Sequence, residues 1–296
     1  MRWILAVGLV AVSSFVAAPA DACSTCSTGD PTLTVTGVEQ PFEGRTRVSL
    51  QMQHRTESTG VSGVDAIDIS EQRFELSGAY ALSERLFLAT KIPLVRRRAR
   101  YVNLARDDVM SLGDVEAFAK WFVFRDRSLA PRHLVALNGG LSLPTGVVFE
   151  DELGRPLPLE AQVGSASLDV LAGVSYSWFF SPFSMFVSAN AGLPVWHGST
   201  FRTGAVGLVS WAMQYQPFDM VALRLSLDAR IDQAVREEGE VDPHSGGLAT
   251  VVSPEVVLSP FDDLVLRAVV MLPAYRAVRG DHDEGVSVLF GAAYDI

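Results

Sequence analysis

Charged side chains recur on one face of several alternating segments of this chain. In the clearest of these, residues 221–232, the odd-numbered positions carry Val, Leu, Ala and Ile, while the even-numbered positions include Arg224, Asp228, Arg230 and Asp232. Successive side chains of an extended strand point to opposite faces, so one face is apolar and the other is charged. Charged groups in such a row could line an aqueous path and select polar solutes, or they could form ion pairs between neighbouring strands.

The same arrangement extends to other segments. If the apolar faces contact lipid, an Arg or Lys on that side at mid-membrane depth would cost about 2–4 kcal/mol, so the charged faces must point inward. We therefore predict a set of lumen-facing residues: Lys91, Asp114, Glu116, Lys120, Asp169, Arg224, Asp228, Arg230, Asp232 and Arg267. Two interpretations of this set stay open. It is either a salt-bridged interior that only stabilises the wall or a lumen that selects polar solutes.

The only two cysteines form a separate candidate site, Cys23-Ser-Thr-Cys26. A haem-attachment motif would need His at position 27, where this chain has Ser, and a zinc site would need a second pair of ligands. Thiolates are soft ligands, so a contact with copper or with a redox partner is one interpretation. We favour a small local disulfide or a pair of free thiols, and we expect no cofactor.

Two pairs of His and Ser, His197-Gly198-Ser199 and His244-Ser245, are the candidates for nucleophilic catalysis. A hydrolase needs Ser and His side by side, with the base oriented by a third group. Both pairs lie in Gly-containing segments without an evident acidic partner. We therefore predict that the protein is not an enzyme and has no catalytic residues.

The N-terminus indicates export. Arg2, the apolar stretch 4–16 and the sequence Ala20-Asp21-Ala22 are typical of a signal peptide with its cleavage site. We expect residues 1–22 to be removed and residues 23–44 to form a periplasmic tail. No later segment is long and apolar enough for a spanning helix, so a membrane domain would have to be a closed barrel. The net charge of −10 argues against nucleic acid as a partner.

Twelve alternating segments are predicted as strands of one antiparallel β-barrel domain over residues 45–296, with ten or fourteen strands as alternatives. Short turns mostly follow the even-numbered segments and long polar links the odd-numbered ones, as in outer-membrane barrels whose periplasmic turns are short. This alternation predicts that both termini are periplasmic. The predicted segments are 45–55, 71–81, 86–95, 113–124, 133–143, 164–179, 184–195, 204–215, 221–232, 248–258, 264–274 and 285–296.

Two further groups of side chains are placed by this topology. The group Arg96-Arg97-Arg98 with Arg100 is predicted to lie in an outer loop, where it could meet anionic lipopolysaccharide or be solvated. Aromatic residues near strand ends are predicted to form interfacial girdles. They are Trp121, Phe122, Trp178, Phe179, Phe180, Trp196, Tyr215, Phe218, Phe261 and Tyr275.

Four motifs appear in a recognisable order. They are Gly113-Asp114-Val115-Glu116-Ala117, Leu143-Pro144-Thr145-Gly146, Gly164-Ser165-Ala166-Ser167-Leu168-Asp169 and Leu272-Pro273-Ala274-Tyr275. In this order they resemble the outer-membrane transporters grouped with the phenol-degradation meta-pathway proteins. The resemblance implies a barrel of about twelve strands that passes small, apolar or aromatic molecules, and it supplies no catalytic residues.

The chain departs from this family in its Cys23/Cys26 pair and in its last residue, Ile296, where an aromatic residue is usual. Tyr294 and Phe290 keep the aromatic spacing, so we expect recognition by the barrel assembly machinery. The sequence thus predicts a passive outer-membrane channel whose partners are membrane lipids and a small-molecule solute. The alternative is a closed barrel with a binding or structural role, whose periplasmic cysteines contact a metal or a redox partner. An outer-membrane hydrolase is less favoured.

Overall fold

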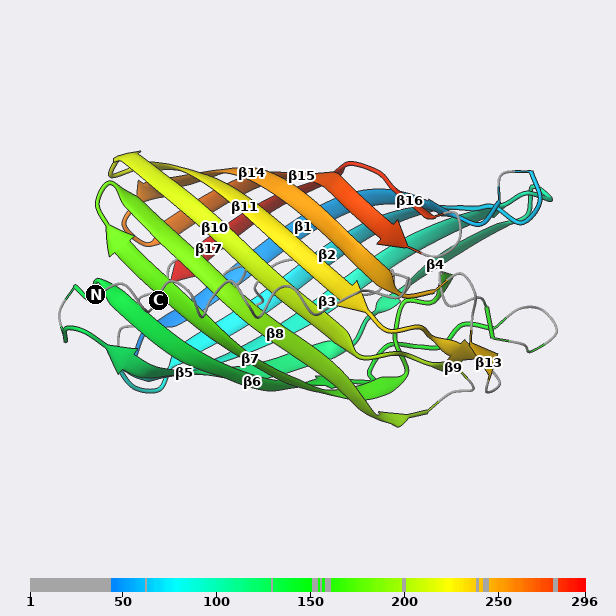
Figure 1. Cartoon of the computed structure of the whole chain (residues 1–296), viewed down its shortest axis with the longest axis horizontal. Helices are drawn as coiled ribbons and strands as arrows, with labels where there is room; N and C mark the ends of the chain where they lie inside the picture. Colours follow the sequence, from blue (N-terminus) through cyan, green and yellow to red (C-terminus); the bar gives the residue numbers. More distant parts are fainter. Residues whose placement is uncertain are drawn as a thin grey trace, which may run out of the picture.

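The computed structural model describes residues 44–61, 63–128, 130–150, 154, 156–157, 161–198, 201–237, 240–241, 245–278 and 282–296. Within these ranges the chain forms one closed antiparallel β-barrel of twelve strands (Figure 1). No helix in the described ranges is long and apolar enough to cross a membrane. The predicted signal peptide, the predicted periplasmic tail, Cys23 and Cys26 lie outside the described residues.

The prediction of twelve strands is confirmed, and each predicted segment overlaps one strand of the wall. Each strand pairs with the next one along the wall, and β17 pairs with β1 to close the barrel. The wall strands are β1 (Thr46–Thr59), β2 (Ile67–Ala81), β3 (Leu86–Tyr101), β5 (Val115–Arg125), β6 (His133–Leu143), β7 (Ser167–Phe180), β8 (Phe183–His197), β10 (Val206–Phe218), β11 (Val221–Asp232), β14 (Gly247–Phe261), β15 (Leu264–Val278) and β17 (Ser287–Asp295).

Within the described residues, five short strands lie at the end of the barrel that carries the long links. β4 (Arg106–Leu112) continues the wall beyond β5 by pairing with the outer half of β3. β16 (His282–Glu284) does the same for β17 by pairing with β1. β9 (Phe201–Arg202), β12 (Arg236–Glu237) and β13 (Glu240–Val241) form a small separate sheet.

The two ends of the barrel differ as Figure 1 shows. The short turns gather at one end together with the C-terminus, whereas β1, β2, β3 and β4 reach furthest at the other. The first described residues also lie at the short-turn end, because the Gly44 N–H donates to the Ala81 carbonyl at 2.9 Å and the Thr46 N–H donates to that of Ile296 at 3.1 Å. The start and the end of the described barrel are therefore on the same side.

The outer face of the wall is apolar. In β11, Leu223, Leu225 and Leu227 are between 44% and 48% exposed, whereas Arg224 and Arg230 are 3% exposed. A water-soluble protein would bury the leucines and expose the arginines. The reverse order is what a lipid-facing exterior and a polar interior require.

Most of the predicted girdle residues are on this outer face near strand ends. At the short-turn end the rings of Phe180, Phe183 and Tyr215 form a contiguous row, with centroids 5.8 Å and 5.0 Å apart. The prediction is wrong for Phe122 and Phe179. Phe122 is 3% exposed inside the barrel, and Phe179 packs against its cluster. Both side chains point inward along their strands. Their position near a strand end, on which the prediction was based, does not indicate the direction of the side chain.

Candidate functional site in the barrel lumen

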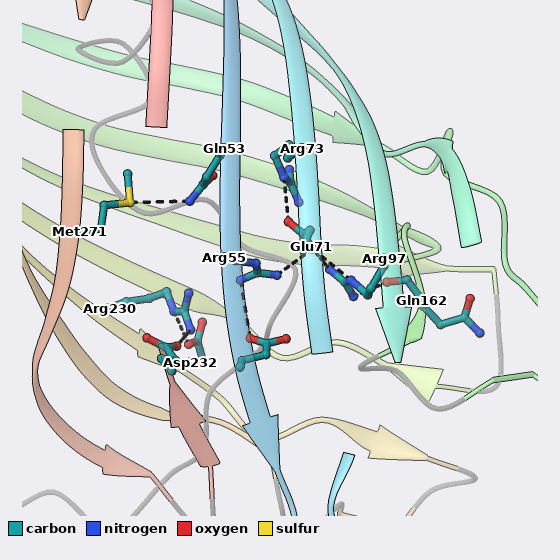
Figure 2. A network of polar contacts seen from close by, with 11 residues as sticks. Gln53, Arg55, Glu71, Arg73, Arg97, Gln162, Arg230, Asp232 and Met271 are labelled. Carbon is teal, nitrogen blue, oxygen red and sulfur yellow. Dashed lines mark hydrogen bonds and ion pairs between the residues drawn. The ribbon is translucent and has the colours of Figure 1, made fainter. Parts of the chain in front are cut away.

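A network of ion pairs lines one side of the lumen (Figure 2). Its centre is Glu71 in β2, whose carboxylate meets the guanidinium groups of Arg55 in β1 at 2.9 Å, Arg73 in β2 at 3.2 Å, and Arg97 in β3. Arg55 and Arg97 are the direct cross-strand partners of Glu71. The pairing of β1, β2 and β3 therefore places opposite charges side by side in the interior.

Two further clusters continue this charged side. Arg230 in β11 lies 2.8 Å from Asp232 and 3.3 Å from Glu284. Glu255 in β14 lies between Arg224 at 3.5 Å and Arg267 at 3.1 Å. A buried charge is tolerated when it is paired and hydrogen-bonded, so these clusters explain how the strands can bury so many ionised groups.

None of the ten residues predicted to face the lumen is exposed on the apolar outer side. Lys91 lies 3.7 Å from Glu116 and 5.6 Å from the ring centroid of Phe118. Lys120 lies 5.6 Å from the ring centroid of Phe122. The structure brings together Lys91 with Glu116, Arg230 with Asp232, and Arg224 with Arg267 through Glu255. Asp228 is buried in β11, and Asp114 and Asp169 border the cavity described below. A role of these residues in selecting solutes stays a prediction.

Sequence reasoning missed the centre of the network, Arg55, Glu71, Arg73 and Arg97. The prediction of an outer loop is wrong for all four arginines, because β3 continues to Tyr101, and Arg97 is 0% exposed inside the barrel. Arg97 lies an even number of residues from the buried Lys91 and Val95, so the alternation along the strand could have predicted that its side chain faces inward. The run of four arginines obscured it.

The other arginines of that run do face outward. Arg96 pairs with Asp108 in β4 at 2.7 Å, Arg98 with the same carboxylate at 3.1 Å, and Arg100 with Asp68 at 2.5 Å. The hydrogen bond from Arg96 lowers the pKa of Asp108 to about 2. Charges on the outer face indicate that this part of the wall projects beyond the lipid, where no apolar face is required.

A cavity of about 170 Å³ lies on the other side of the lumen. Its wall is built mainly from small, amide and apolar side chains of β5, β6, β7, β8 and β10, and Arg73 of the ion-pair network borders it. Asn138 donates to the Oδ1 atom of Asn190 at 3.1 Å across this wall. A Cβ atom on Gly173 would come within 2.0 Å of that oxygen, so the glycine makes room for the amide pair.

Within the link between β6 and β7, the described residues 161–163 lie inside the barrel, and Val163 borders the cavity. These residues, Ala161, Gln162 and Val163, are at most 3% exposed, although they lie in no strand. The Gln162 carbonyl accepts a hydrogen bond from Arg97, and its side chain bonds both backbone groups of Phe149 at 2.8 Å. Figure 2 shows Gln162 beside the ion-pair network. The link is thus tied to the charged side of the lumen.

One carboxylate holds both ends of this link. Asp114 precedes β5, and its Oδ1 atom accepts the Gly146 N–H at 2.9 Å while Oδ2 accepts the Ser165 N–H at 2.6 Å. The Thr145 hydroxyl donates to the Gly113 carbonyl at 2.9 Å and accepts the Val115 N–H at 2.9 Å. Three of the four motifs quoted from the sequence therefore meet in space at Asp114.

The described residues build no metal site, and they contain only one member of each predicted His/Ser pair. They contain no group of three His, Cys, Asp or Glu side chains that could hold a metal ion. Of the predicted pairs, Ser199 and His244 lie outside the described residues. The Ser245 hydroxyl accepts the Val235 N–H at 2.9 Å, so it is engaged in holding the backbone.

A closed antiparallel barrel with an apolar outer face and a charged interior defines the class of fold, that of the bacterial outer-membrane β-barrels. Among solved structures, the chain is similar to an outer-membrane channel from Pseudomonas putida F1, with 15% identity, coverage of 90% of this chain and 100% of the channel, and a TM-score of 0.69. It is also similar to the translocator domain of the autotransporter NalP from Neisseria meningitidis, with 12% identity, coverage of 88% and 92%, and a TM-score of 0.54. No protein-family model and no curated protein sequence matches the chain. What these structures share with the chain is the fold.

Proposed function

We propose that the protein is a passive outer-membrane channel for small molecules and belongs to the transporter family that its motifs resemble. The observation that carries this proposal is the cavity of about 170 Å³ inside a barrel whose outer face suits lipid. An apolar protein cavity of similar size, about 150 Å³, holds a benzene molecule. The size of the cavity and its apolar groups, Phe118, Leu171 and Leu208, suit a small apolar or aromatic solute.

The proposal also assigns the orientation and the partners. Residues 1–22 are the signal peptide, residues 23–44 form a periplasmic tail, and the short-turn end with both termini faces the periplasm. Phe290 and Tyr294 are 59% and 53% exposed on the outer face of the last strand. Aromatic side chains in these positions suit contact with lipid and with the barrel assembly machinery. We propose no enzymatic activity, since the similar channel and the lumen both favour passage of a solute.

The experiment is single-channel conductance of the refolded mature protein in a planar bilayer, titrated with small aromatic and anionic solutes. We expect steady openings that a small aromatic solute reduces, because it would occupy the cavity. Openings that no solute affects would contradict the cavity as the path. A correctly folded but silent barrel would contradict the channel altogether.

A silent barrel would favour the second candidate, a closed barrel with a binding or structural role. The ion-pair network supports this candidate, because Glu71, Arg97 and Asp232 are each at most 2% exposed and close part of the lumen. Its proposed working part is then the Cys23/Cys26 tail. Metal content and growth under copper stress that stay unchanged after Cys23→Ser and Cys26→Ser would contradict that role.

A further inference from the structure

The link between β6 and β7 is held in the lumen at three places. Asp114 fixes its two ends through Gly146 and Ser165. Thr145 fixes the first end again, to Gly113 and Val115. Arg97 fixes the buried part through the Gln162 carbonyl. Backbone groups of a link that passes through a barrel need such partners, since an unpaired buried N–H or C=O is costly.

The same link borders the cavity. Val163 and Ser165 are part of the cavity wall, together with Gly113 and Asp114. The two ends of the link cross closely, because a Cβ atom on Gly146 would come within 2.5 Å of the Cα atom of Gly164. Any change that released these ends would therefore remove part of the cavity wall and widen the free space beside it.

We propose that Asp114 is the positioning residue that keeps residues 161–165 of the β6–β7 link inside the lumen, and that these residues thereby set the largest solute that can pass. This inference rests on the proposed channel function and assigns a size filter within it. The carboxylate suits the task because it offers two acceptor oxygens to two N–H donors. An asparagine offers one acceptor and one NH₂ group, so one of the two N–H groups would lose its partner.

The chain offers a matched control for this role. Asp114 and Glu116 are both acidic, both border the cavity, and both sit within the same short stretch of chain. Glu116 pairs with Lys91 at 3.7 Å and accepts no hydrogen bond from the described residues of the link. Asp114→Asn and Glu116→Gln therefore remove the same charge from the cavity, but only the first change loosens the link.

The first measurement is amide hydrogen exchange of the refolded protein. In Asp114→Asn we expect the amide that loses its acceptor, that of Gly146 or that of Ser165, to exchange at least about tenfold faster than in the wild type, because a charge-assisted hydrogen bond is lost. In Glu116→Gln both amides should keep the wild-type rate. Equal rates in all three proteins would overturn the role of Asp114, whether or not the barrel conducts.

The second measurement is the flux of a size series of uncharged solutes in a liposome-swelling assay. Flux rises with pore width, so we expect at least about a twofold rise in flux and a larger size limit in Asp114→Asn. The control is Asp126→Asn, which removes a carboxylate that accepts two N–H groups of the β5–β6 turn and does not line the cavity, and it should leave flux and size limit at their wild-type values. If Asp114→Asn does not fold, Thr145→Val should give the same changes to a smaller degree. A conducting wild type whose size limit is unchanged in the loosened variant would overturn the filter. A silent wild type would instead contradict the proposed channel itself.

Discussion

The two sides of the lumen are built from different kinds of residue. On β1, β2, β3, β11, β14 and β15 the inward positions carry long charged side chains, with Glu71, Arg97 and Arg224 as examples. On β6, β7 and β8 they carry small or amide side chains, with Asn138, Gly173 and Asn190 as examples. The charged side fills its space with ion pairs, whereas the small-residue side leaves the cavity open.

The difference has an energetic origin. Ionised groups inside a barrel need opposite charges at hydrogen-bonding distance, so each added charge brings a partner and fills volume. Serine and asparagine side chains hydrogen-bond one another with few atoms, and glycine has no side chain, so these residues leave room for a solute. Under the proposed function, the solute path runs along the small-residue side, and the charged side is the wall against which Arg97 fixes the β6–β7 link.

The largest effect is expected from breaking the charged side at its centre. Glu71→Gln leaves Arg55, Arg73 and Arg97 without their shared counter-charge, and removing one partner of a buried ion pair costs about 3–5 kcal/mol. We expect the free energy of unfolding, measured by denaturant titration in detergent, to fall by about 3 kcal/mol, at the lower end because some water reaches the lumen.

Glu75→Gln is the control for this variant. Glu75 lies on the same strand and in the same phase as Glu71, and it makes no ion pair with another described residue. We expect a change within about 0.5 kcal/mol for this variant. A similar fall in the free energy of unfolding in both variants would mean that the ion pairs around Glu71 contribute no more than a single unpaired carboxylate. That result would contradict the contrast between the two sides of the lumen.

The sequence predicted the wall of the barrel well, for a physical reason. Lipid outside and polar groups inside impose the same two-residue period on every strand, so even short segments such as 133–143 and 221–232 match strands β6 and β11 in both bounds. The period loses its contrast beyond the lipid, where both faces are polar. The predicted third strand therefore stopped at Val95, while β3 continues to Tyr101.

The site was less accessible from the sequence. The motifs around Asp114, Thr145 and Ser165 were recognised by their order, but their meeting point depends on a link that folds back into the lumen, and no local period encodes that path. The cavity was not predictable either, because it is space left by small side chains on several strands at once. Inward charges could be identified one by one, whereas their partners depend on strand register.

A smaller effect on stability, but a large one on passage, is expected from filling the small-residue side. Leu171 in β7 borders the cavity, so Leu171→Trp should occupy much of its volume and reduce the flux of small solutes in liposome swelling. Leu223→Trp, on the outer face of β11 and 48% exposed, is the control and should leave flux unchanged. Equal flux through both variants would show that the solute path avoids the cavity.

The smallest effect is expected at the rim of the small-residue side, in the turn between β5 and β6. Asp126 accepts the N–H groups of Arg132 at 2.8 Å and His133 at 2.9 Å, and the bond from His133 is the largest cause that lowers the pKa of Asp126 below its usual 3.8. A carboxyl group whose pKa is lowered by folding stabilises the folded state above its unfolded pKa, and this contribution is lost as the pH falls through the lowered value.

Asp126→Asn should therefore lower the denaturation midpoint at neutral pH by a small amount, and the difference from the wild type should shrink as the pH falls below 3.8. A difference that grows toward acid would contradict this assignment. Because Asp126 is held by the backbone of its own turn and not by the lumen charges, its effect should add independently to that of Glu71→Gln. Non-additive losses in the double variant would show that the rim and the charged side are coupled, and that the two sides of the lumen do not act as separate structures.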